Sequence, residues 1–459
     1  MTPDLDIPCD RPVALLLRHA ERPLLGPHDV GLHTPLTAAG TLQAEALGRT
    51  LAPVLKDIHT SPILRARATA EALARGAGRP LAITDDRLLG DPGIFVADPS
   101  RAWANWLAHG ADGMLALLAD PHPLPGLRDP TIAAHRLAAH LVEHCDHADP
   151  GIHAFITHDA LLIPLLATTW QRPLPPSLWP EFLAPVALWR DGAGLRLHYG
   201  GRTVAVPPAR PLITVLIVTH DRPALLHEAV RSVLGQRVDA DVELLIVGDT
   251  SPSLESMRDD LSVAVQILNI PREREFPSTS ARLGNLRNLG IQHAAGDWIA
   301  FLDDDNRFTP DHLATLLATA IATGAPAVHS HRLLLEPDGA AWAGTHFLWP
   351  TPGLDYAAAL RWLTDEGVLA PPVMRDRTSL YRGYPGTVDT SEWLVRRRTC
   401  LEIPWPDDVH LEDESAGISE DGVWLRRLVA AHVPIACSER ATLLFRLGGR
   451  FETLRRPTR

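Results

Sequence analysis

Three consecutive aspartates stand where an apolar run of the chain ends, and such a cluster can hold a divalent cation. The run is "DWIAFL", and the acidic residues that end it or follow it are Asp303, Asp304 and Asp305. Adjacent carboxylates repel one another by about 1 kcal/mol per pair at 4 Å in water, and by about 4 kcal/mol at an effective dielectric constant of 20. A cation between them removes that cost, and hard carboxylate oxygens suit Mg²⁺ or Mn²⁺. The alternative is a solvated acidic turn ahead of a helix.

Two histidines stand at strand ends in the N-terminal half, where they can serve a phosphate group. Arg18 and His19 follow the apolar run of "LLLRHAER", and His158 and Asp159 follow that of "FITHDA", with Arg65 between them in the chain. Arginine binds phosphate in a bidentate manner, and histidine can accept a phosphoryl group. One histidine at a strand end is usually structural, but two of them with these arginines indicate a phosphate pocket.

Both clusters need strands that end at a common edge of a sheet, and the surrounding sequence predicts such strands. Short apolar runs alternate with stretches of helical periodicity in both halves, as in "LITVLIVTH" followed by "PALLHEAVRSVLGQ". Alternating strands and helices favour a mostly parallel sheet with right-handed crossovers. Ligands of such sheets bind beyond the carboxyl ends of the strands, which is where the polar clusters fall.

The length of the chain and a proline-rich connector within it predict two domains. With 459 residues, the chain exceeds what one ordinary core requires. The segment 186–206 reads as strands joined by an Asp-Gly turn, and the stiff proline-rich connector "PPARP" follows it. We therefore expect two α/β domains, at 1–207 and 208–459.

Composition and charge exclude several classes of protein. The net charge of −12 argues against a general nucleic-acid or acidic-membrane binder, because phosphate groups are held by excess Lys and Arg. The four cysteines are far apart without metal or redox spacing, which favours a reduced protein and implies no thiol chemistry. No basic and apolar leader is visible, and no apolar run reaches the roughly 20 residues that span a bilayer. We expect a cytoplasmic protein without an integral membrane segment or a nucleic-acid partner.

The second half resembles the family 2 glycosyltransferases of GT-A fold over nearly its whole length. Segments that match follow the family's order: "ITVLIVTHDRPALLHEAVRSVLGQ", "VELLIVGDTS", "LRNLGIQHAAGDWIAFLDDDNRFTPDHL" and "SEDGVWLRRL". The resemblance implies a Rossmann-like nucleotide-sugar-binding domain with a nucleotide-sugar donor. It also implies a divalent metal, Mg²⁺ or Mn²⁺, that bridges the donor's diphosphate and is held at an Asp-x-Asp motif, here Asp303 and Asp305. Such a metal neutralises the nucleoside diphosphate as it leaves.

The same resemblance assigns roles to further residues of this half. Asp421 in "SEDGVWLRRL" becomes the base for the acceptor hydroxyl, since an inverting displacement needs a carboxylate opposite the leaving group. Residues implied near the donor or acceptor are Thr219, Asp221, Asp249, Arg287, Asn288, Asp304, Trp393 and Glu420. Without the resemblance, Glu420 and Asp421 read as N-terminal helix charges, and Trp393 reads equally as a core residue.

Two departures from the family pattern concern the donor site. The family often has two acidic residues where this chain reads "VGD", so Gly248 replaces one of them and the preferred base stays open. A histidine commonly follows the base segment near the metal, but "FRLGGR" (445–450) has none. The metal's ligands are therefore incomplete or completed by substrate.

The first half, across roughly residues 10–205, resembles the histidine phosphatase superfamily, the phosphoglycerate mutase-like proteins of three-layer α/β architecture. The matching segments are "RHAERP", "LTAAGTLQAEALG", "TSPILRARATAEAL" and "ITHDALL". The resemblance implies that His19 is the nucleophile that becomes phosphohistidine. Arg18, Arg65 and His158 would surround the phosphoryl group and stabilise its charge.

The proton donor for the leaving alcohol is left open between three acidic residues. The His-Asp pair of the acid-phosphatase-like branch favours Asp159, and the same branch implies Arg22 as a phosphate ligand. Glu21 and Asp91 are the alternatives. Ala20 stands where the family usually has glycine, which predicts a methyl group near the phosphate.

Together the two resemblances imply a bifunctional enzyme. It would transfer a sugar to a phosphorylated or hydroxylated small-molecule acceptor and hydrolyse a phosphate monoester of the acceptor or the product. Joining successive activities in one chain raises the local concentration of the intermediate. Two alternatives stay open: a glycosyltransferase whose phosphatase-like domain only binds the acceptor, and a non-catalytic scaffold that binds sugar nucleotides.

Overall fold

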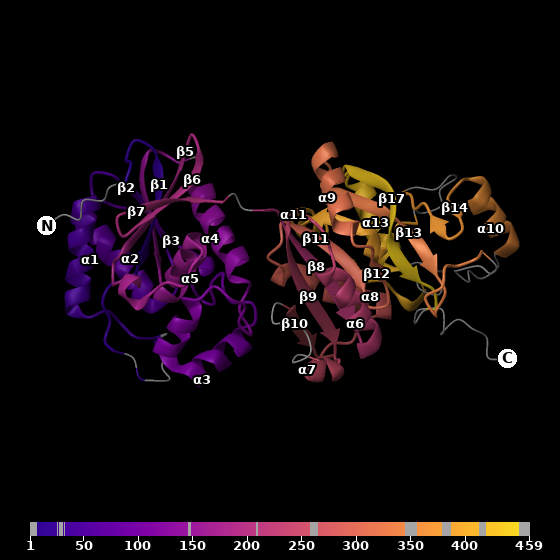
Figure 1. Ribbon diagram of the computed structural model, residues 1–459, viewed down its shortest axis with the longest axis horizontal. Helices are drawn as coiled ribbons and strands as arrows, with labels where there is room; N and C mark the ends of the chain where they lie inside the picture. Colours follow the sequence, from indigo (N-terminus) through magenta and orange to yellow (C-terminus); the bar gives the residue numbers. More distant parts are fainter. Residues whose placement is uncertain are drawn as a thin grey trace. The chain divides into compact units, whose positions relative to one another are not determined.

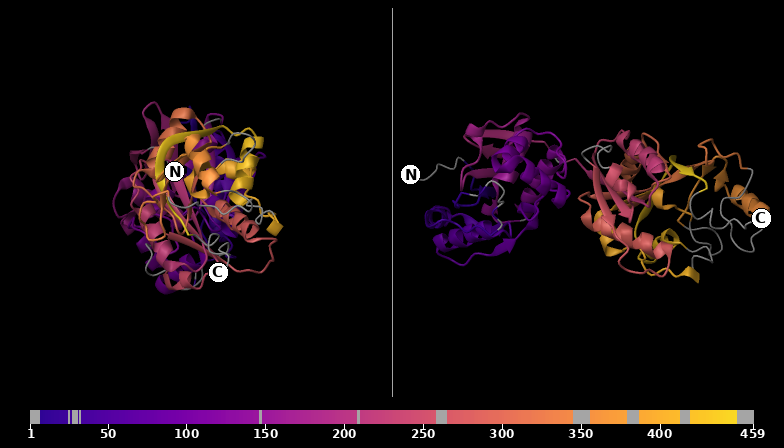
Figure 2. Two further views of the ribbon diagram at one scale, coloured as in Figure 1. Left: turned by 90° about the vertical axis from the view of Figure 1, so that its right-hand side faces the viewer. Right: turned by 90° about the horizontal axis from the view of Figure 1, so that it is seen from below.

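The computed structural model describes residues 7–24, 26, 31, 33–145, 148–207, 210–257, 265–344, 356–378, 387–412 and 419–448. The chain forms two compact units, Met1–Arg210 and Pro211–Arg459 (Figures 1 and 2). The first six residues of the N-terminus, positions 208–209 of the expected connector and positions 449–450 of "FRLGGR" lie outside the described residues.

In the described part of the first unit, seven strands form one sheet in the order β3-β2-β4-β1-β5-β6-β7. The strands are β1 (Pro12–Arg18), β2 (Leu55–Thr60), β3 (Ile83–Asp85), β4 (Gly151–Thr157), β5 (Pro185–Asp191), β6 (Gly194–Tyr199) and β7 (Arg202–Val206). β3, β2, β4 and β1 run parallel, and β5 to β7 continue the sheet in antiparallel fashion. The antiparallel part corresponds to the segment in which an Asp-Gly turn was expected.

Helices cover both faces of this sheet, so the first unit has three layers (Figure 1). The helices are α1 (Ala38–Leu51) and α2 (Leu64–Ala77) on one face, and α3 (Pro99–Leu118), α4 (Pro130–Cys145) and α5 (Asp159–Trp170) on the other. Leu15 and Leu17 of β1 pack toward α1 and α2, whereas Ala14 and Leu16 pack toward α4 and α5. Because successive side chains of a strand point to opposite faces, a strand buried on both sides reads as one apolar run.

The second unit is built around a larger, mixed sheet in the order β10-β9-β8-β11-β16-β13-β15-β14, with β17 pairing β13 and β12. Its strands are β8 (Leu212–Thr219), β9 (Asp241–Asp249), β10 (Val265–Ile270), β11 (Trp298–Asp303), β12 (Arg307–Phe308), β13 (Ala327–Leu335), β14 (Leu369–Ala370), β15 (Val373–Met374), β16 (Trp393–Arg396) and β17 (Ile435–Arg446). β10, β9, β8 and β11 are parallel, and β16 is antiparallel to both β11 and β13.

Helices also sandwich this second sheet. They are α6 (Pro223–Leu234), α7 (Ser253–Met257) and α9 (His312–Thr323) on one face, and α8 (Thr279–His293), α11 (Arg397–Glu402) and α13 (Glu420–Ala430) on the other, while α10 (Tyr356–Asp365) lies beside β14. Trp405 and Trp424 stack with ring centroids 4.2 Å apart against Phe301 of β11. This aromatic cluster attaches α13 to the strand that ends in the aspartates.

The expected fold class, two α/β domains, is confirmed by these sheets and helices. Among the described residues, no helix combines the length and the apolar character that a membrane crossing requires. In both units the parallel strands carry their polar residues at the carboxyl ends, so the two candidate sites form there.

Candidate functional site

β1 and β4 bring the two predicted histidines together at the carboxyl edge of the first sheet. The strands pair in parallel with Arg18 opposite Thr157, so the residues that follow them emerge side by side. His19 and His158 are both buried, and their ring centroids are 5.3 Å apart. His158 is also the N-cap residue of α5, which begins at Asp159.

The hydrogen bonds of His19 set its tautomer. Nδ1 lies 2.8 Å from the carbonyl oxygen of Ala20, which can only accept, so Nδ1 carries the proton. Nε2 then holds a lone pair and accepts a hydrogen bond from Nε of Arg65 at 3.0 Å. Burial, followed by the charge of Arg65, lowers the pKa of His19 well below its usual value. His19 is therefore a neutral imidazole with a lone pair on Nε2, which is the form that a nucleophile needs.

His158 lies against Ser61 and a glycine that leaves its ring clear. Its Nε2 is 3.0 Å from Oγ of Ser61, and burial followed by the charge of Arg65 lowers its pKa well below the usual value. A Cβ atom on Gly90 would lie 2.5 Å from Oγ of Ser61 and 2.9 Å from Nε2 of His158. Only glycine at this position keeps that edge of the imidazole open.

Three arginines bring positive charge to the two neutral imidazoles. The charges of Arg65, Arg18 and Arg22 all act to lower the pKa of His19. Arg18 is held in place by an ion pair with Asp159 at 2.5 Å, by the carbonyl of Pro180 at 2.8 Å, and by the ring of Phe182. Three cations around two uncharged rings form a site that favours an anion.

The structure places the three candidate proton donors differently. Asp159 is ion-paired with Arg18, and Glu21 accepts a hydrogen bond from the hydroxyl of Thr37 at 3.3 Å. Asp91 directly follows Gly90 and lies within 3.5 Å of Arg87. All three stay candidates.

The expectation for Ala20 needs correction. Its side chain is fully buried and packs with Ala44 and Ala72 of α1 and α2. Its backbone N–H donates to the hydroxyl of Thr69 at 2.9 Å. The extra methyl group therefore fills the core under the loop instead of pointing at the phosphate pocket.

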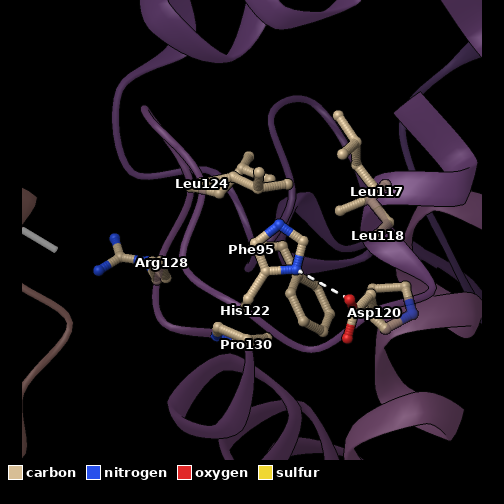
Figure 3. A pocket seen from close by; sticks show the side chains of 10 residues that line it. Phe95, Leu117, Leu118, Asp120, His122, Leu124, Arg128 and Pro130 are labelled. Atoms are coloured by element: carbon tan, nitrogen blue, oxygen red, sulfur yellow. Dashed lines mark ion pairs between the residues drawn. The ribbon is translucent and has the colours of Figure 1, made fainter. Parts of the chain in front are cut away.

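A small pocket also lies in the first unit, but it shares no residue with the histidine site. Apolar side chains line most of it, together with His122 and Asp120, which are 3.7 Å apart between Nδ1 and Oδ2 (Figure 3). We assign it no chemistry.

In the second unit, the three aspartates differ sharply in their surroundings. Asp303 ends β11 and keeps 30% of its side chain exposed, with Nη2 of Arg287 at 3.2 Å. Asp304 is completely buried and accepts a hydrogen bond from the hydroxyl of Thr219 at 2.6 Å. Asp305 is 16% exposed and pairs with Nη1 of Arg222 at 2.8 Å. Only Asp303 and Asp305 are therefore open to a ligand.

Arg222 was not singled out from the sequence, yet it organises this cluster. It follows β8 and forms ion pairs with both Asp304 and Asp305. Burial raises the pKa of Asp304 to about 7 against the opposing charge of Arg222. The sequence did contain a pattern that could have identified it. Arg222 follows the first strand of a parallel sheet, and a neighbouring strand ends in three carboxylates with which it can pair.

Arg287 connects the aspartates to the proposed base segment. Its Nη2 contacts Asp303, and its Nη1 lies 2.6 Å from Oε1 of Glu420, the first residue of α13. Asp421 follows in the same first turn and accepts hydrogen bonds from the hydroxyl of Ser419 and from the N–H of Gly422. The ion pairs of Arg287 thus hold the strand end and the helix start together.

Asp389 is a further carboxylate of this site that the sequence did not single out. It lies just before β16 and pairs with Nη1 of Arg332 at 3.2 Å. Burial raises its pKa, and the charges of Asp303 and Asp421 raise it further against the effect of Arg332. The carboxylate of Asp389 therefore lies near enough to those of Asp303 and Asp421 to be repelled by both.

These carboxylates fit a divalent cation. Burial and the charge of Asp303 also raise the pKa of Asp305, against the effect of Arg222. A cation relieves such repulsion, and hard carboxylate oxygens are the ligands that Mg²⁺ and Mn²⁺ prefer. Asp303 and Asp305 would be the protein ligands, and water and phosphate oxygens would fill the other positions.

The remaining residues expected at the donor site fall into two groups. Asp249 lies at the carboxyl end of β9 between Arg272 and Arg282, and the N–H of Ser253 donates to Asp221 at 3.2 Å. Asn288, in contrast, exchanges two hydrogen bonds of 2.9 Å with the backbone of Trp405. These bonds fix the position of Trp405, and a contact of Asn288 with substrate stays a prediction.

Three residues expected to contact substrate lie inside the protein. Trp393 is 1% exposed and packs against Trp424 and His329, so it is the core tryptophan of the alternative and does not stack on a sugar. Thr219 and Asp304 are buried and bonded to each other. Thr219 and Asp304 support the site from beneath it.

In comparisons with known proteins, a different family model matches each of the two units. The model of the glycosyl transferase family 2 matches residues 214–372, and that of the histidine phosphatase superfamily (branch 1) matches residues 14–182. The second match is to branch 1, so it lends no support to the acid-phosphatase-like branch that the His-Asp pair suggested.

Curated relatives match part of the second unit. The putative colanic acid biosynthesis glycosyl transferase WcaA of Escherichia coli (strain K12) is 34% identical over 109 residues, which are 24% of this chain and 37% of that protein. The GalNAc(5)-diNAcBac-PP-undecaprenol beta-1,3-glucosyltransferase of Campylobacter jejuni is 30% identical over 114 residues, 24% of this chain and 35% of that protein. The chain thus spans little more than a third of the length of these relatives.

Among solved structures, S. aureus TarS 1-349 in complex with UDP is 17% identical with a TM-score of 0.33, over 52% of this chain and 62% of that one. Two separate family models match the chain, one in each unit. It joins an N-terminal domain of the histidine phosphatase superfamily to a C-terminal domain of glycosyltransferase family 2.

Proposed function

We propose that the C-terminal domain transfers a sugar from a nucleotide-sugar donor to a small-molecule acceptor with inversion, and that the N-terminal domain hydrolyses a phosphate monoester of that acceptor or of the product. The observation that carries the transfer is the link through Arg287 between Asp303 and the first turn of α13. It holds the candidate metal ligands and the candidate base in one fixed arrangement.

In the transferase domain, Asp421 is the residue that removes the acceptor proton. Its hydrogen bonds from Ser419 and Gly422 both reach Oδ1, which leaves Oδ2 for the acceptor hydroxyl. Its place in the first turn of α13 suits an acidic side chain, because the helix N-terminus carries partial positive charge. A divalent cation held by Asp303 and Asp305 would neutralise the departing nucleoside diphosphate.

In the phosphatase domain, Nε2 of His19 attacks the phosphorus atom, and the bond from phosphorus to the leaving alcohol breaks. Arg65, Arg18 and Arg22 stabilise the charge that builds up on the phosphoryl oxygens. A carboxyl group protonates the leaving alcohol. Water then attacks the phosphohistidine, which releases phosphate and restores the neutral imidazole.

A thermal-shift and hydrolysis screen tests the transfer. Purified protein is incubated with UDP-, GDP- and dTDP-sugars and Mn²⁺ or Mg²⁺, in the wild type and in Asp305→Ala. We expect one nucleotide to stabilise the wild type in the presence of metal, and the variant to lose that effect. No stabilisation by any nucleotide would argue against a donor site at the aspartates.

The phosphatase part is tested separately with a chromogenic phosphate monoester. We expect phosphate release by the wild type and none by His19→Ala, with unchanged nucleotide binding in both. The opposite result has two parts: the wild type releases phosphate from no substrate, and His19→Ala still transfers sugar. That result would identify the N-terminal domain as an acceptor-binding domain.

A further inference from the structure

Two histidines and a cysteine of the second unit converge where β13 and β17 pair. His329 and His331 stand two residues apart on β13, and Cys437 is opposite His329 in the register of β17. One ligand atom from each of the three lies within 4.8 Å of the other two. Neither the aspartate site nor the base segment uses any of these residues.

A bulge in β17 adds a carboxylate to this group. The register passes from His329–Cys437 to His331–Ala441, so four residues of β17 span two of β13. Within the bulge, Glu439 has a φ of 56°, a left-handed conformation that is costly for a residue other than glycine. Bulges of this kind re-aim side chains next to functional sites.

The bulge directs both the side chain and the backbone of Glu439 toward the cluster. Its Oε2 lies 3.4 Å from Nε2 of His331, and its N–H donates to Sγ of Cys437 at 3.3 Å. The backbone strain and the two contacts are observations independent of the histidine–cysteine spacing. They place the carboxylate of Glu439 beside His331 and its N–H beside Cys437.

The tautomer of His329 suits a metal ligand. Its Nδ1 is 2.9 Å from the carbonyl oxygen of Ser330, so Nδ1 carries the proton and Nε2 holds the lone pair. Metal-bound histidines usually donate their other ring N–H to a carbonyl or carboxylate in this way.

The types of ligand select the metal. Two imidazoles, a thiolate and a carboxylate are the set that Zn²⁺ binds in a tetrahedron, whereas Mg²⁺ and Ca²⁺ avoid sulfur. Zinc–ligand bonds of about 2.0–2.3 Å separate tetrahedral ligands by about 3.3–3.8 Å. The ligand atoms of His329, His331 and Cys437 lie within 4.8 Å of one another and need only small side-chain adjustments to reach that geometry. The exposed side chain of Glu439, 3.4 Å from His331, would turn in to complete it.

A reactive thiol is the rival explanation for Cys437. Its Sγ lies 3.7 Å from Nε2 of His331 and accepts a hydrogen bond from the N–H of Glu439 at 3.3 Å, and 3.7 Å is a separation that two ligands of one tetrahedral zinc ion also have. Cys437 is also a free cysteine rather than half of a disulfide.

We propose that His329, His331, Cys437 and Glu439 bind one zinc ion that fixes β17 to β13. The neighbouring Arg332 on β13 pairs with Asp376 and with Asp389. The zinc ion would therefore stiffen the strand that positions a carboxylate of the transferase site, without taking part in the transfer.

Metal content and cobalt substitution of the full chain, purified without a histidine tag, test this site. We expect about one equivalent of zinc to survive dialysis against metal-free buffer. Co²⁺ in its place should give a sulfur-to-cobalt charge-transfer absorption, which carboxylates alone cannot produce. Cys437→Ser should lose both signals, and the matched control Cys9→Ser, an exposed cysteine of the first unit, should keep both.

A second variant guards against a fold defect in Cys437→Ser. The side chain of Glu439 is 79% exposed, so Glu439→Gln should fold normally. We expect it to bind zinc roughly tenfold or more weakly, at least the loss that an outer-shell partner typically causes. The control Glu412→Gln, another exposed carboxylate of this unit, should leave the affinity unchanged.

Two results would overturn the proposal. One is a wild-type protein that retains no zinc and shows no thiolate–cobalt band. The other is a band that persists in Cys437→Ser. An unchanged zinc affinity in Glu439→Gln would remove Glu439 from the set of ligands.

Discussion

The histidine site and the aspartate site occupy the same topological position but carry opposite charge. Both lie beyond the carboxyl ends of parallel strands, as ligand sites of α/β sheets generally do. In the first, Arg18, Arg22 and Arg65 act on neutral imidazoles. In the second, burial and neighbouring carboxylates raise the pKa of Asp305 and of Asp389, against the charges of Arg222 and Arg332.

This difference shows that topology decides where a ligand binds and residue type decides which ligand it is. The first site combines arginine side chains with neutral imidazoles and favours a phosphate. The second has unbalanced negative charge and favours a metal ion together with the diphosphate that the metal would bridge. Substitutions that affect one site and spare the other are the sharpest way to test the contrast.

The largest expected effect is that of His19→Ala on phosphate release. Loss of the nucleophile leaves only binding and charge stabilisation, so we expect kcat/KM for a phosphate monoester to fall by about 10⁴ or more. Metal-dependent nucleotide stabilisation of the same variant should match the wild type. If phosphate release persists, another residue is the nucleophile.

Asp421→Asn should act on the opposite site. The amide keeps the shape of the side chain but cannot accept the acceptor proton, so we expect the kcat of sugar transfer to fall by about 10²–10⁴. The donor KM and the rate of phosphate release should stay close to wild type. An increase in donor KM without a fall in kcat would mean that Asp421 binds the donor and is not the base.

Arg222→Ala should weaken the fold of the second unit. It leaves the buried carboxylate of Asp304 without its cation, a change that costs about 3–5 kcal/mol for a fully buried pair. Because 32% of the Arg222 side chain is exposed, we expect a smaller loss of unfolding free energy, about 2–3 kcal/mol, measured by denaturant titration.

Arg307→Ala is the matched control for that measurement. Arg307 is equally exposed, but its partner Glu228 is on the surface, so the change should cost less than about 1 kcal/mol. Equal losses of unfolding free energy in the two variants would mean that Arg222 forms only an ordinary surface ion pair.

The smallest effect is expected for Ala20→Gly, which introduces the residue that the phosphatase family usually has. Loss of the buried methyl group and the added backbone freedom should cost about 1–2 kcal/mol of unfolding free energy. Phosphatase kcat/KM should change by no more than about twofold. A large gain in activity would place the methyl group in the phosphate pocket after all.

Much of the fold was predictable because local pattern carries it. The apolar runs of β1 and β8 are buried on both faces, and such strands are legible in the sequence without any partner. The residues that end these strands could be identified because each apolar run marks where its strand stops. His19, His158, Asp303 and Asp305 were therefore found where the strands end.

Other parts of the site were not predictable because their partners are distant in the chain. Arg222 and Asp304 are 82 positions apart, and His331 and Cys437 are 106 apart. Cysteine spacing alone therefore indicated no metal site. Trp393 suits a sugar-stacking surface and a hydrophobic core equally well, and only its packing against Trp424 distinguishes the two.

The sequence by itself determined the class of fold and the chemical groups that stand at each strand end, because strand periodicity and helix signals act over a few neighbouring residues. Only the tertiary structure decided which of these groups meet, which are buried as supports, and where the bulge in β17 turns Glu439 toward two histidines. Those outcomes depend on strand order and register, which are set by packing between segments far apart in the chain.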